Sequence, residues 1–475
     1  MAVVQLKTVN ESAAPAKITG YLVLITVIAS LGGLLFGFDI AVISGILPIV
    51  KEQFGFSPAQ EGWFVSSALI GSIVGVAFSG ELSDRFGRKK MLALSAFLFF
   101  FSALGCTLFP DTFWIITSRM VGGIGIGVAS IIVPLYISEV APASVRGSLV
   151  TCYQLAVTVG ILIAYLANAG LLSYATNQAG NSGGGLFHFL FVEEVWRGMF
   201  SILVLPSLIF LVGLLFVPES PRWLIMNSRL SEAVNIFTAI SKDPGGAVME
   251  AEQVSKHSKN ENGSYKELLE PGIRRALLIG ILLPLLSQFS GINAIIYYGP
   301  TILQSAGLEL SDSLTSQIYF GVAIVLFTFI AIWKVDGMGR RKLYLVGTAC
   351  ATVSLFLTGL CFYFGYTGVW LLLCVLLFLA SFAFSIGPLK FVVASEIFPN
   401  KIRGRALAIS IMTMWIADAI LGQLTPISLK SLGTAGTFWA FAVFCLIGFI
   451  VVYKILPETK GKSLEQIEDF WKKSK

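Results

Sequence analysis

Charged residues are scarce in this chain of 475 residues. Asp, Glu, Lys and Arg make up 13% of it, whereas 56% of the residues are hydrophobic and the mean hydropathy is +0.82. Soluble domains carry about 25% charged residues. A soluble enzyme and a nucleic-acid-binding protein are therefore excluded, because the chain has too few charges to cover a water-exposed surface. The composition indicates many membrane-spanning helices joined by short loops.

Residues suited to metal and redox chemistry are also few. Both His residues, His188 and His257, fall in predicted loops, and the six Cys residues are scattered through apolar segments without paired spacing. This pattern excludes a zinc or disulfide framework. The chain also lacks a Gly-x-Ser-x-Gly nucleophile motif. We therefore expect no enzyme activity, no metal site and no cofactor.

What the chain has instead is a series of long apolar runs. Each is bounded by charged residues, Pro or Gly and is long enough to cross a bilayer as a helix. The runs are 20–43, 62–80, 91–109, 113–136, 149–170, 198–217, 276–299, 317–335, 343–364, 368–393, 406–426 and 434–456. They predict an all-α membrane protein with twelve transmembrane helices in two pseudo-symmetric six-helix bundles. The expected domains are an N-terminal tail (1–19), a first bundle (20–217), a linker with short helices (218–275), a second bundle (276–456) and a C-terminal tail (457–475).

The basic residues indicate the orientation of these helices. Most of the 33 Lys and Arg residues fall in the tails and in alternate loops, whereas the other loops carry only Lys51, Arg197 and Lys430. Since basic residues are enriched on the cytoplasmic side, we expect both termini and the linker to be cytoplasmic. The same asymmetry accounts for the net charge of +6 without a nucleic-acid partner.

Three motifs occur twice, once in each half of the chain. Asp84-Arg-Phe-Gly-Arg-Lys corresponds to Asp336-Gly-Met-Gly-Arg-Arg-Lys, Ser138-Glu-Val-Ala-Pro to Ser395-Glu-Ile-Phe-Pro, and Pro218-Glu-Ser to Pro457-Glu-Thr. Their positions after equivalent spans indicate duplication of a six-helix unit, which is a transporter architecture.

Further motifs make the chain resemble the sugar porter family of the major facilitator superfamily. They are Pro218-Glu-Ser-Pro-Arg-Trp-Leu, Pro457-Glu-Thr-Lys-Gly, Gln288-x-x-Ser-Gly-Ile-Asn293 and Tyr297-Tyr298. The chain is most similar to bacterial proton-coupled pentose and hexose symporters. The resemblance covers residues 20–465 and implies two bundles that rock about a central site.

Four ionisable residues fall inside predicted spans, where charge is costly: Asp39, Arg119, Lys390 and Asp418. We expect Asp39 to pair with Arg119, and Lys390 with Asp418. Proton symporters of the family carry an acid at the position of Asp39, so the resemblance implies that Asp39 and Arg119 couple transport to protons. A permanent ion pair holding two spans together is the alternative.

Three interpretations of Lys390 and Asp418 remain open. They can form a structural charge pair in the cavity, Lys390 can meet the carboxylate of a sugar acid, or the two can serve a second proton step.

The resemblance also assigns a set of substrate-binding residues. Sugars need aromatic faces and side chains that form hydrogen bonds with hydroxyls. The set is Phe36, Gln154, Ser287, Gln288, Asn293, Tyr297, Tyr298, Gly387, Phe391, Met414 and Trp415. Ser287, Phe391 and Met414 depart from the family pattern, as does Ile324 in place of an asparagine. Each lost hydrogen bond removes about 1 kcal/mol, so the identity of the sugar stays open.

Charges at the predicted cytoplasmic ends of the helices recur in both halves: Arg85, Glu139, Arg146 and Glu219 in the first, and Arg340, Glu396, Arg403 and Glu458 in the second. Opposite charges that pair in one state and separate in another bias a conformational equilibrium by a few kcal/mol. We expect these residues to gate the cytoplasmic side. Anchoring of helix ends is the alternative.

Together these features predict a monomeric transporter in a bacterial inner membrane that imports a monosaccharide-like solute by proton symport through alternating access. Its partners are then a sugar or polyol, protons and the bilayer. Passive facilitation, and symport of a polyol, inositol or sugar acid, are the alternatives. A sugar sensor is disfavoured because the tails are short.

Overall fold

The computed structural model describes residues 19–142, 145–178, 184–258, 267–268, 270, 273–398 and 402–458. Twelve helices in this part of the chain are long and apolar enough to cross a membrane. This confirms the predicted fold class. The predicted tails lie almost wholly outside the described residues.

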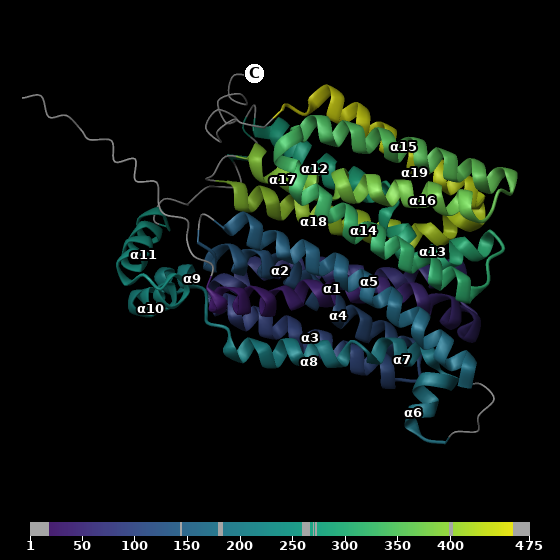
Figure 1. Ribbon diagram of the computed structural model, residues 1–475, viewed down its shortest axis with the longest axis horizontal. Coiled ribbons are helices and arrows are strands. Elements are labelled where there is room, and N and C mark those ends of the chain that lie inside the picture. Colours follow the sequence, from purple (N-terminus) through teal and green to yellow (C-terminus); the bar gives the residue numbers. More distant parts are fainter. Residues whose placement is uncertain are drawn as a thin grey trace, which may run out of the picture.

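The first bundle contains six of these spans (Figure 1). The first five are α1 (Gly20–Phe54), α2 (Pro58–Phe86), α3 (Arg88–Leu108), α4 (Thr112–Val140) and α5 (Arg146–Gln178). The sixth consists of α7 (Val195–Ser201), α8 (Val204–Gly213) and the 3-10 turn η2 (Leu214–Phe216), preceded by α6 (Leu186–His188) and the π-helical turn η1 (Phe189–Glu193).

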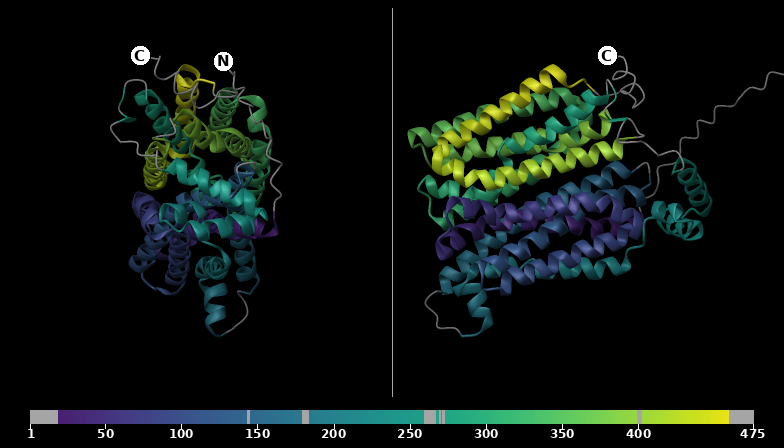
Figure 2. Two further views of the ribbon diagram at one scale, coloured as in Figure 1. Left: turned by 90° about the vertical axis from the view of Figure 1, so that its left-hand side faces the viewer. Right: turned by 180° about the vertical axis from the view of Figure 1, so that it is seen from behind.

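The linker folds into three short helices with a small core of their own. They are α9 (Pro221–Met226), α10 (Leu230–Ser241) and α11 (Pro244–Ser258). Their core contains Leu224, Ile225, Ala233, Phe237, Ala247 and Ala251. The Thr19 hydroxyl, just before α1, donates to the Ile240 carbonyl (2.9 Å). The three helices therefore lie beside the start of α1, at what we call the linker end; α6 lies at the opposite, far end (Figures 1 and 2).

The second bundle contains the other six spans. Its elements are α12 (Ile273–Phe289), α13 (Ile292–Ser305), α14 (Leu310–Met338), α15 (Arg340–Phe364), α16 (Val369–Ser381), the π-helical turn η4 (Phe382–Ile386), α17 (Gly387–Ile397), α18 (Arg403–Ser431) and α19 (Gly433–Ile455). Helices α12 and α13 form one span that is interrupted at Gly291, where φ is +85°. This interruption sits in the Gln288–Asn293 motif and offsets the two half-helices.

Local sequence signals set the ends of several helices. Ser57 and Gln60 form a reciprocal capping box at the start of α2, with Pro58 at the first helical position. Gly87 (φ +98°) and Gly339 (φ +85°) occupy the same turn of the duplicated motif, before α3 and α15. Only glycine adopts this conformation readily, so the repeat in sequence is also a repeat in backbone geometry.

Glycine also allows the closest helix contacts in the first bundle. A Cβ atom on Gly123 of α4 would lie 2.0 Å from the Ala68 carbonyl oxygen of α2, and one on Gly127 would lie 2.3 Å from that of Ser72. The glycines of α4 therefore let α2 and α4 approach along their length. This packing holds Arg119 of α4 close to α1 and α2.

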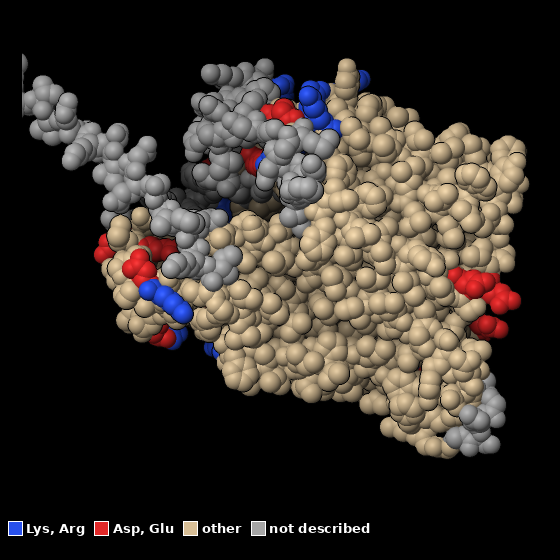
Figure 3. All heavy atoms as spheres, viewed as in Figure 1, with Lys and Arg blue, Asp and Glu red and all other residues tan. Residues whose placement is uncertain are grey.

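The outer surface between the two ends carries no charge in the view of Figure 3, and the charged residues visible there gather at the ends. Large apolar side chains are exposed along the membrane-spanning helices, among them Phe78 (57%), Leu205 (65%) and Val443 (54%). Such a band fits the hydrocarbon core of a bilayer.

Candidate functional site

Asp39 and Arg119 line the same small cavity between the two bundles. Asp39 belongs to α1 and Arg119 to α4, whereas Tyr297 of α13 closes the cavity from the second bundle. The remaining lining is apolar: Ile40, Ile43, Val65, Ala68 and Leu69. Asp39 is 6% exposed and Arg119 is 4% exposed. The structure therefore brings an acid and a base together where the bundles meet, away from the outer surface.

The two side chains do not form a direct ion pair in this structure, because no Arg119 nitrogen lies within 4.0 Å of the Asp39 carboxylate. Arg119 Nε instead donates to the Phe64 carbonyl (3.0 Å), and its guanidinium lies 5.3 Å from the Phe64 ring centroid and 5.8 Å from that of Phe200. Arg119 Nη1 has no hydrogen-bond partner among the described residues. The Nε edge of the guanidinium is thus fixed by the Phe64 carbonyl, and the Nη1 edge can accept a further partner.

Several predicted substrate-binding residues lie together on α12, α13 and α18. The Asn293 amide donates to Gln288 Oε1 (3.1 Å), and the Tyr297 hydroxyl donates to Asp418 Oδ2 (3.0 Å). The ring centroids of Trp415 and Phe36 are 5.6 Å apart, so this aromatic pair joins the second bundle to α1 of the first. Amides, a phenol and aromatic faces therefore surround the boundary between the bundles, as a sugar requires.

The other predicted substrate-binding residues differ in their surroundings. Tyr298 is buried and donates to the Gly422 carbonyl (2.6 Å), which ties α13 to α18. Gln154 on α5 and Gly387 at the start of α17 are half-buried, and Met414 is buried. Phe391 lies on α17, but its side chain is outside the described part of the structure.

Lys390 and Asp418 are both buried in the second bundle, at 7% and 2% exposure. The direct ion pair expected from the sequence is not formed, since no contact between them falls within 4.0 Å. Lys390 Nζ donates to Ser287 Oγ (3.3 Å) and lies 5.7 Å from the Phe382 ring centroid, whereas Asp418 accepts from Tyr297. Ser287, where the family has an amide, thus serves as a partner of Lys390.

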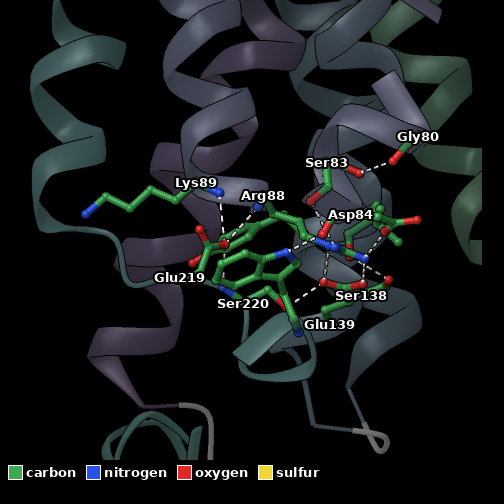
Figure 4. A network of polar contacts seen from close by, with 12 residues as sticks. Gly80, Ser83, Asp84, Arg88, Lys89, Ser138, Glu139, Glu219 and Ser220 are labelled. Carbon is green, nitrogen blue, oxygen red and sulfur yellow. Dashed lines mark hydrogen bonds and ion pairs between the residues drawn. The ribbon is translucent and has the colours of Figure 1, made fainter. Parts of the chain in front are cut away.

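A buried charge network occupies the linker end of the first bundle (Figure 4). Arg88 Nε and Nη2 donate to the two carboxylate oxygens of Glu139, and each donor–acceptor distance is 3.0 Å. Arg88 also forms an ion pair with Asp84 (3.1 Å). The Ser220 hydroxyl donates to the same Glu139 carboxylate. A bidentate, buried pair of this kind is among the stronger charge contacts in proteins.

Two duplicated acids cap equivalent helices in the two bundles. Glu219 accepts from the backbone N–H groups of Arg88 (2.9 Å) and Lys89 (3.0 Å) at the start of α3. Glu458 accepts from those of Arg340 (2.9 Å) and Arg341 (3.2 Å) at the start of α15. Carboxylates are favourable at helix N-termini. The Glu residues of the Pro-Glu-Ser and Pro-Glu-Thr motifs therefore both cap the N-terminus of a helix.

Only some of the predicted gating residues form ion pairs or helix caps of this kind. Arg340 pairs with Glu396 (2.9 Å) in the second bundle, as Arg88 pairs with Glu139 in the first. Arg85, predicted as a gating residue, is exposed and lies over the Phe86 ring (5.2 Å), whereas Arg88 of the same motif forms the buried pair with Glu139. Arg146 donates to the Ala141 carbonyl (3.4 Å), and the side chain of Arg403 lies outside the described residues.

The hydrogen bonds that join described residues of the two bundles lie at the far end. Ser44 of α1 donates to Gln317 Oε1 of α14 (2.7 Å), and Ser66 of α2 donates to Gln423 Oε1 of α18 (3.0 Å). Gln423 Nε2 in turn donates to the Ala59 carbonyl (3.0 Å). The bundles are therefore closed against each other on that side.

These far-end contacts leave no recognisable signal in the sequence. Single Ser and Gln residues inside apolar helices carry no charge and belong to no duplicated motif, so only the packing of the bundles shows that they meet. An ion pair at the same end, between the partly exposed Lys51 and the buried Glu61 (2.8 Å), was also not predicted. A tally of loop charges treats both of its members as solvent-exposed.

Comparison with known proteins gives consistent matches over almost the whole chain. The family described as "Sugar (and other) transporter" matches residues 25–471. The arabinose-proton symporter of Bacillus subtilis (strain 168) is 42% identical over 454 residues, covering 95% of each chain. The D-xylose-proton symporter of Escherichia coli (strain K12) is 35% identical over 487 residues, covering 95% of this chain and 96% of that protein.

A solved structure is similar as well. The partially occluded inward-open conformation of the xylose transporter XylE from E. coli superposes with a TM-score of 0.81 at 34% identity, covering 94% of this chain and 100% of that one. The fold, the duplicated motifs and these matches lead to one conclusion: the chain belongs to the sugar transporter family of the major facilitator superfamily.

Proposed function

We propose that this protein imports a monosaccharide by proton symport, through alternating access between its two bundles. The observation that carries this proposal is the cavity in which Asp39 and Arg119 of the first bundle meet Tyr297 of the second. A titratable acid and a fixed base at a moving interface are what coupling requires. The similarity to an arabinose-proton symporter and a D-xylose-proton symporter supports it.

The contacts between the bundles indicate the state of the transporter. Ser44, Ser66 and Gln423 join the bundles at the far end, and no hydrogen bond between described residues joins them at the linker end. The excess of Lys and Arg supports a cytoplasmic location for the linker end. We infer that the structure is closed to the periplasm, in a bacterial inner membrane, with both termini cytoplasmic and the single chain as the functional unit.

Proton coupling follows from the contacts of Arg119. As an anion, Asp39 attracts the edge of the guanidinium that has no partner in this structure; as a neutral acid it does not. Arg119 Nε is held by the Phe64 carbonyl in this structure. Protonation of Asp39 therefore changes the force between α1 and α4 beside Tyr297, where the second bundle is in contact, and this links the proton to the position of the bundles.

Substrate binding falls to the polar and aromatic residues next to this cavity. Gln288 and Asn293 offer amides for sugar hydroxyls, and Phe36 and Trp415 offer ring faces. Gln154, Ser287, Gly387, Phe391 and Met414 complete the proposed set. Tyr297 belongs to both proposed sites, which supports one contiguous region for substrate and proton.

The linker-end networks complete the cycle. We propose that Arg88–Glu139 and Arg340–Glu396, with Glu219 and Glu458 at the helix starts, keep each bundle rigid while the bundles move. In the state closed to the cytoplasm the same charged ends come together and act as the gate.

The experiment that tests this proposal is sugar-evoked pH change in energy-depleted cells expressing the protein. L-arabinose, D-xylose, D-galactose, myo-inositol and D-glucuronate are added in turn. External alkalinisation with an aldose supports sugar–proton symport, and alkalinisation with inositol or glucuronate alone moves the substrate to that class. Equilibration of labelled sugar without alkalinisation would make the protein a facilitator and refute the coupling.

A further inference from the structure

Glu61 of α2 is a buried acid that the proposed transport cycle does not use. It lies in the first turn of the helix, is 1% exposed and forms an ion pair with Lys51 of α1 (2.8 Å) through Oε2. Its other oxygen, Oε1, has no hydrogen-bond partner among the described residues. An ionisable residue inside a membrane-spanning helix is costly and usually functional. Buried polar atoms are almost always hydrogen-bonded, so the unpaired oxygen requires an explanation.

Glu61 lies between the Asp39 cavity and the far end. Asp39 and Ile43 line that cavity from α1, and Val65 lines it from α2. Glu61 is four residues before Val65 and on the same face of α2, one turn nearer the far end, where α2 begins. Its partner Lys51 lies eight residues beyond Ile43, which is about 12 Å along α1 in the same direction. The ion pair therefore covers the far-end side of the cavity.

A larger cavity reaches Lys51 from the far end. It has a volume of about 300 Å³ and lies between the last turns of α1 and α13, where Thr301 and Gln304 line it. The Lys51 side chain is 40% exposed, whereas that of Glu61 is 1% exposed. Lys51 thus connects the far-end surface to a carboxylate that solvent does not reach in this structure.

The contacts that close the far end surround Glu61. The Gln423 side chain of the second bundle donates to the Ala59 carbonyl (3.0 Å) and accepts from the Ser66 hydroxyl (3.0 Å). A Cβ atom on Gly62 would lie 2.4 Å from the Gln423 carbonyl oxygen. Separation of the bundles at this end removes Gln423 from the residues on both sides of Glu61. Opening of the far end therefore admits water to this acid.

We propose that Glu61 is a proton-relay residue, which takes up the proton at the far end and passes it to Asp39. This inference rests on the proposed function and adds a second acid to it. In the state open at the far end, Glu61 Oε1 accepts a proton from water, and the attraction to Lys51 weakens because the carboxyl is then neutral. Water between the two acids carries the proton to Asp39. Glu61 becomes an anion again and returns to Lys51.

The groups around Glu61 suit this role. Lys51 faces it from α1, and Tyr298 of α13 lies within its electrostatic reach. On the α4 side, Arg119 is held by a carbonyl of α2. The contact from α18 is a neutral amide. Each acid thus has its own cation, Lys51 for Glu61 and Arg119 for Asp39, and a proton can pass between them without isolating a buried carboxylate.

The test measures sugar uptake into proteoliposomes that are driven by the same membrane potential at two external pH values. The probe is whichever of labelled L-arabinose, D-xylose and D-galactose the wild type accumulates. A positioned acid accelerates proton transfer most where protons are scarce. The initial rate in Glu61→Gln should fall at least tenfold at about pH 8 and less than threefold at about pH 5.5. Counterflow exchange of labelled for unlabelled sugar involves no net proton movement and should not change.

Further variants distinguish a relay from a structural ion pair. Lys51→Met breaks the same pair but keeps the acid, so the ratio of its rates at the two pH values should stay as in the wild type. Glu61→Asp restores a carboxylate and should recover at least half of the rate lost at high pH. Asp111→Asn, which removes an exposed acid at the same end, is the matched control and should behave as the wild type.

The outcomes separate the two proposals. Equal losses at both pH values in Glu61→Gln and Lys51→Met would make the pair structural and overturn this inference alone, as would unchanged uptake in Glu61→Gln. If Glu61→Gln does not fold with Lys51 unpaired, Lys51→Met combined with Glu61→Gln replaces both charges and should show the same loss at high pH. A wild type that accumulates none of the three sugars refutes the proposed function, and this inference with it.

Discussion

The hydrogen bonds at the far end should control which side of the transporter is open. Ser44–Gln317 and Ser66–Gln423 form only while the bundles are closed at that end. A net contribution of about 1 kcal/mol for each bond gives about 2 kcal/mol in favour of the closed arrangement. Since 1.4 kcal/mol is a factor of ten, replacing both serines by alanine should raise the ratio of far-end-open to far-end-closed molecules about 30-fold.

Spin labels can measure this population directly. In a cysteine-free background, labels at Asp111 and Tyr366 report the separation of the two bundles, because both positions are exposed in far-end loops of different bundles. Double electron–electron resonance on Ser44→Ala/Ser66→Ala should show a longer distance population that is minor in the parent. The matched control is Ser67→Ala/Ser72→Ala, whose hydroxyls bond within α2 to the Phe64 (2.9 Å) and Ala68 (3.0 Å) carbonyls. Identical distributions in all three proteins would refute the assignment of these bonds as a lock.

Three further predictions concern the packing and the linker end. Glu139→Gln removes the buried charged partner of Arg88 and leaves it only the exposed Asp84, so the free energy of unfolding should fall by about 3 kcal/mol. Glu232→Gln, in the exposed pair with Arg229, should leave the melting temperature nearly unchanged, and equal melting temperatures for the two variants would contradict the reasoning. Gly123→Ala would place a Cβ against the Ala68 carbonyl, whereas Gly170→Ala meets nothing within 4 Å, so only the first should lower the melting temperature in detergent. Burial raises the pKa of Glu250, and attraction to Arg146 and Arg222 opposes this shift. The folded linker helices then bind this proton more readily than the unfolded chain, so their stability should decrease as pH rises through the interval between the two pKa values. The hydrogen-exchange protection factors of α11, which correct for the intrinsic pH dependence of exchange, should fall across that interval in the wild type and not in Glu250→Gln.

The sequence predicted the fold well because its signals are strong and local. Twelve long apolar runs leave no alternative to membrane helices, and the duplicated motifs divide them into two bundles. The ends of the helices were less well predicted. The first predicted run ends at residue 43, whereas helix α1 continues to Phe54. Its last turns contain Pro48 and Lys51, which do not fit the pattern of an apolar run. Hydropathy detects the apolar part of a helix and misses its polar extension.

Side-chain pairing was the hardest feature to predict. Arg85 and Arg88 belong to the same motif, yet Arg88 begins α3 and points to Glu139, whereas Arg85 ends α2 and is exposed. The turn at Gly87 lies between the two arginines, so Arg85 and Arg88 belong to different helices and only the Arg88 side chain is buried. Lys390 and Asp418 were matched by charge, but the hydroxyls of Ser287 and Tyr297 are their direct partners. Geometry within a bundle therefore decides pairings that charge alone cannot.

The measurement that tests the central claim most directly is sugar accumulation by Asp39→Asn in proteoliposomes with an imposed proton gradient. A driving force of 100 mV on one proton is about 2.3 kcal/mol, or about 50-fold accumulation. The wild type should approach this value. Asp39→Asn should equilibrate sugar without accumulating it, while its counterflow exchange persists because substrate contacts remain. Accumulation by Asp39→Asn equal to that of the wild type would contradict the account.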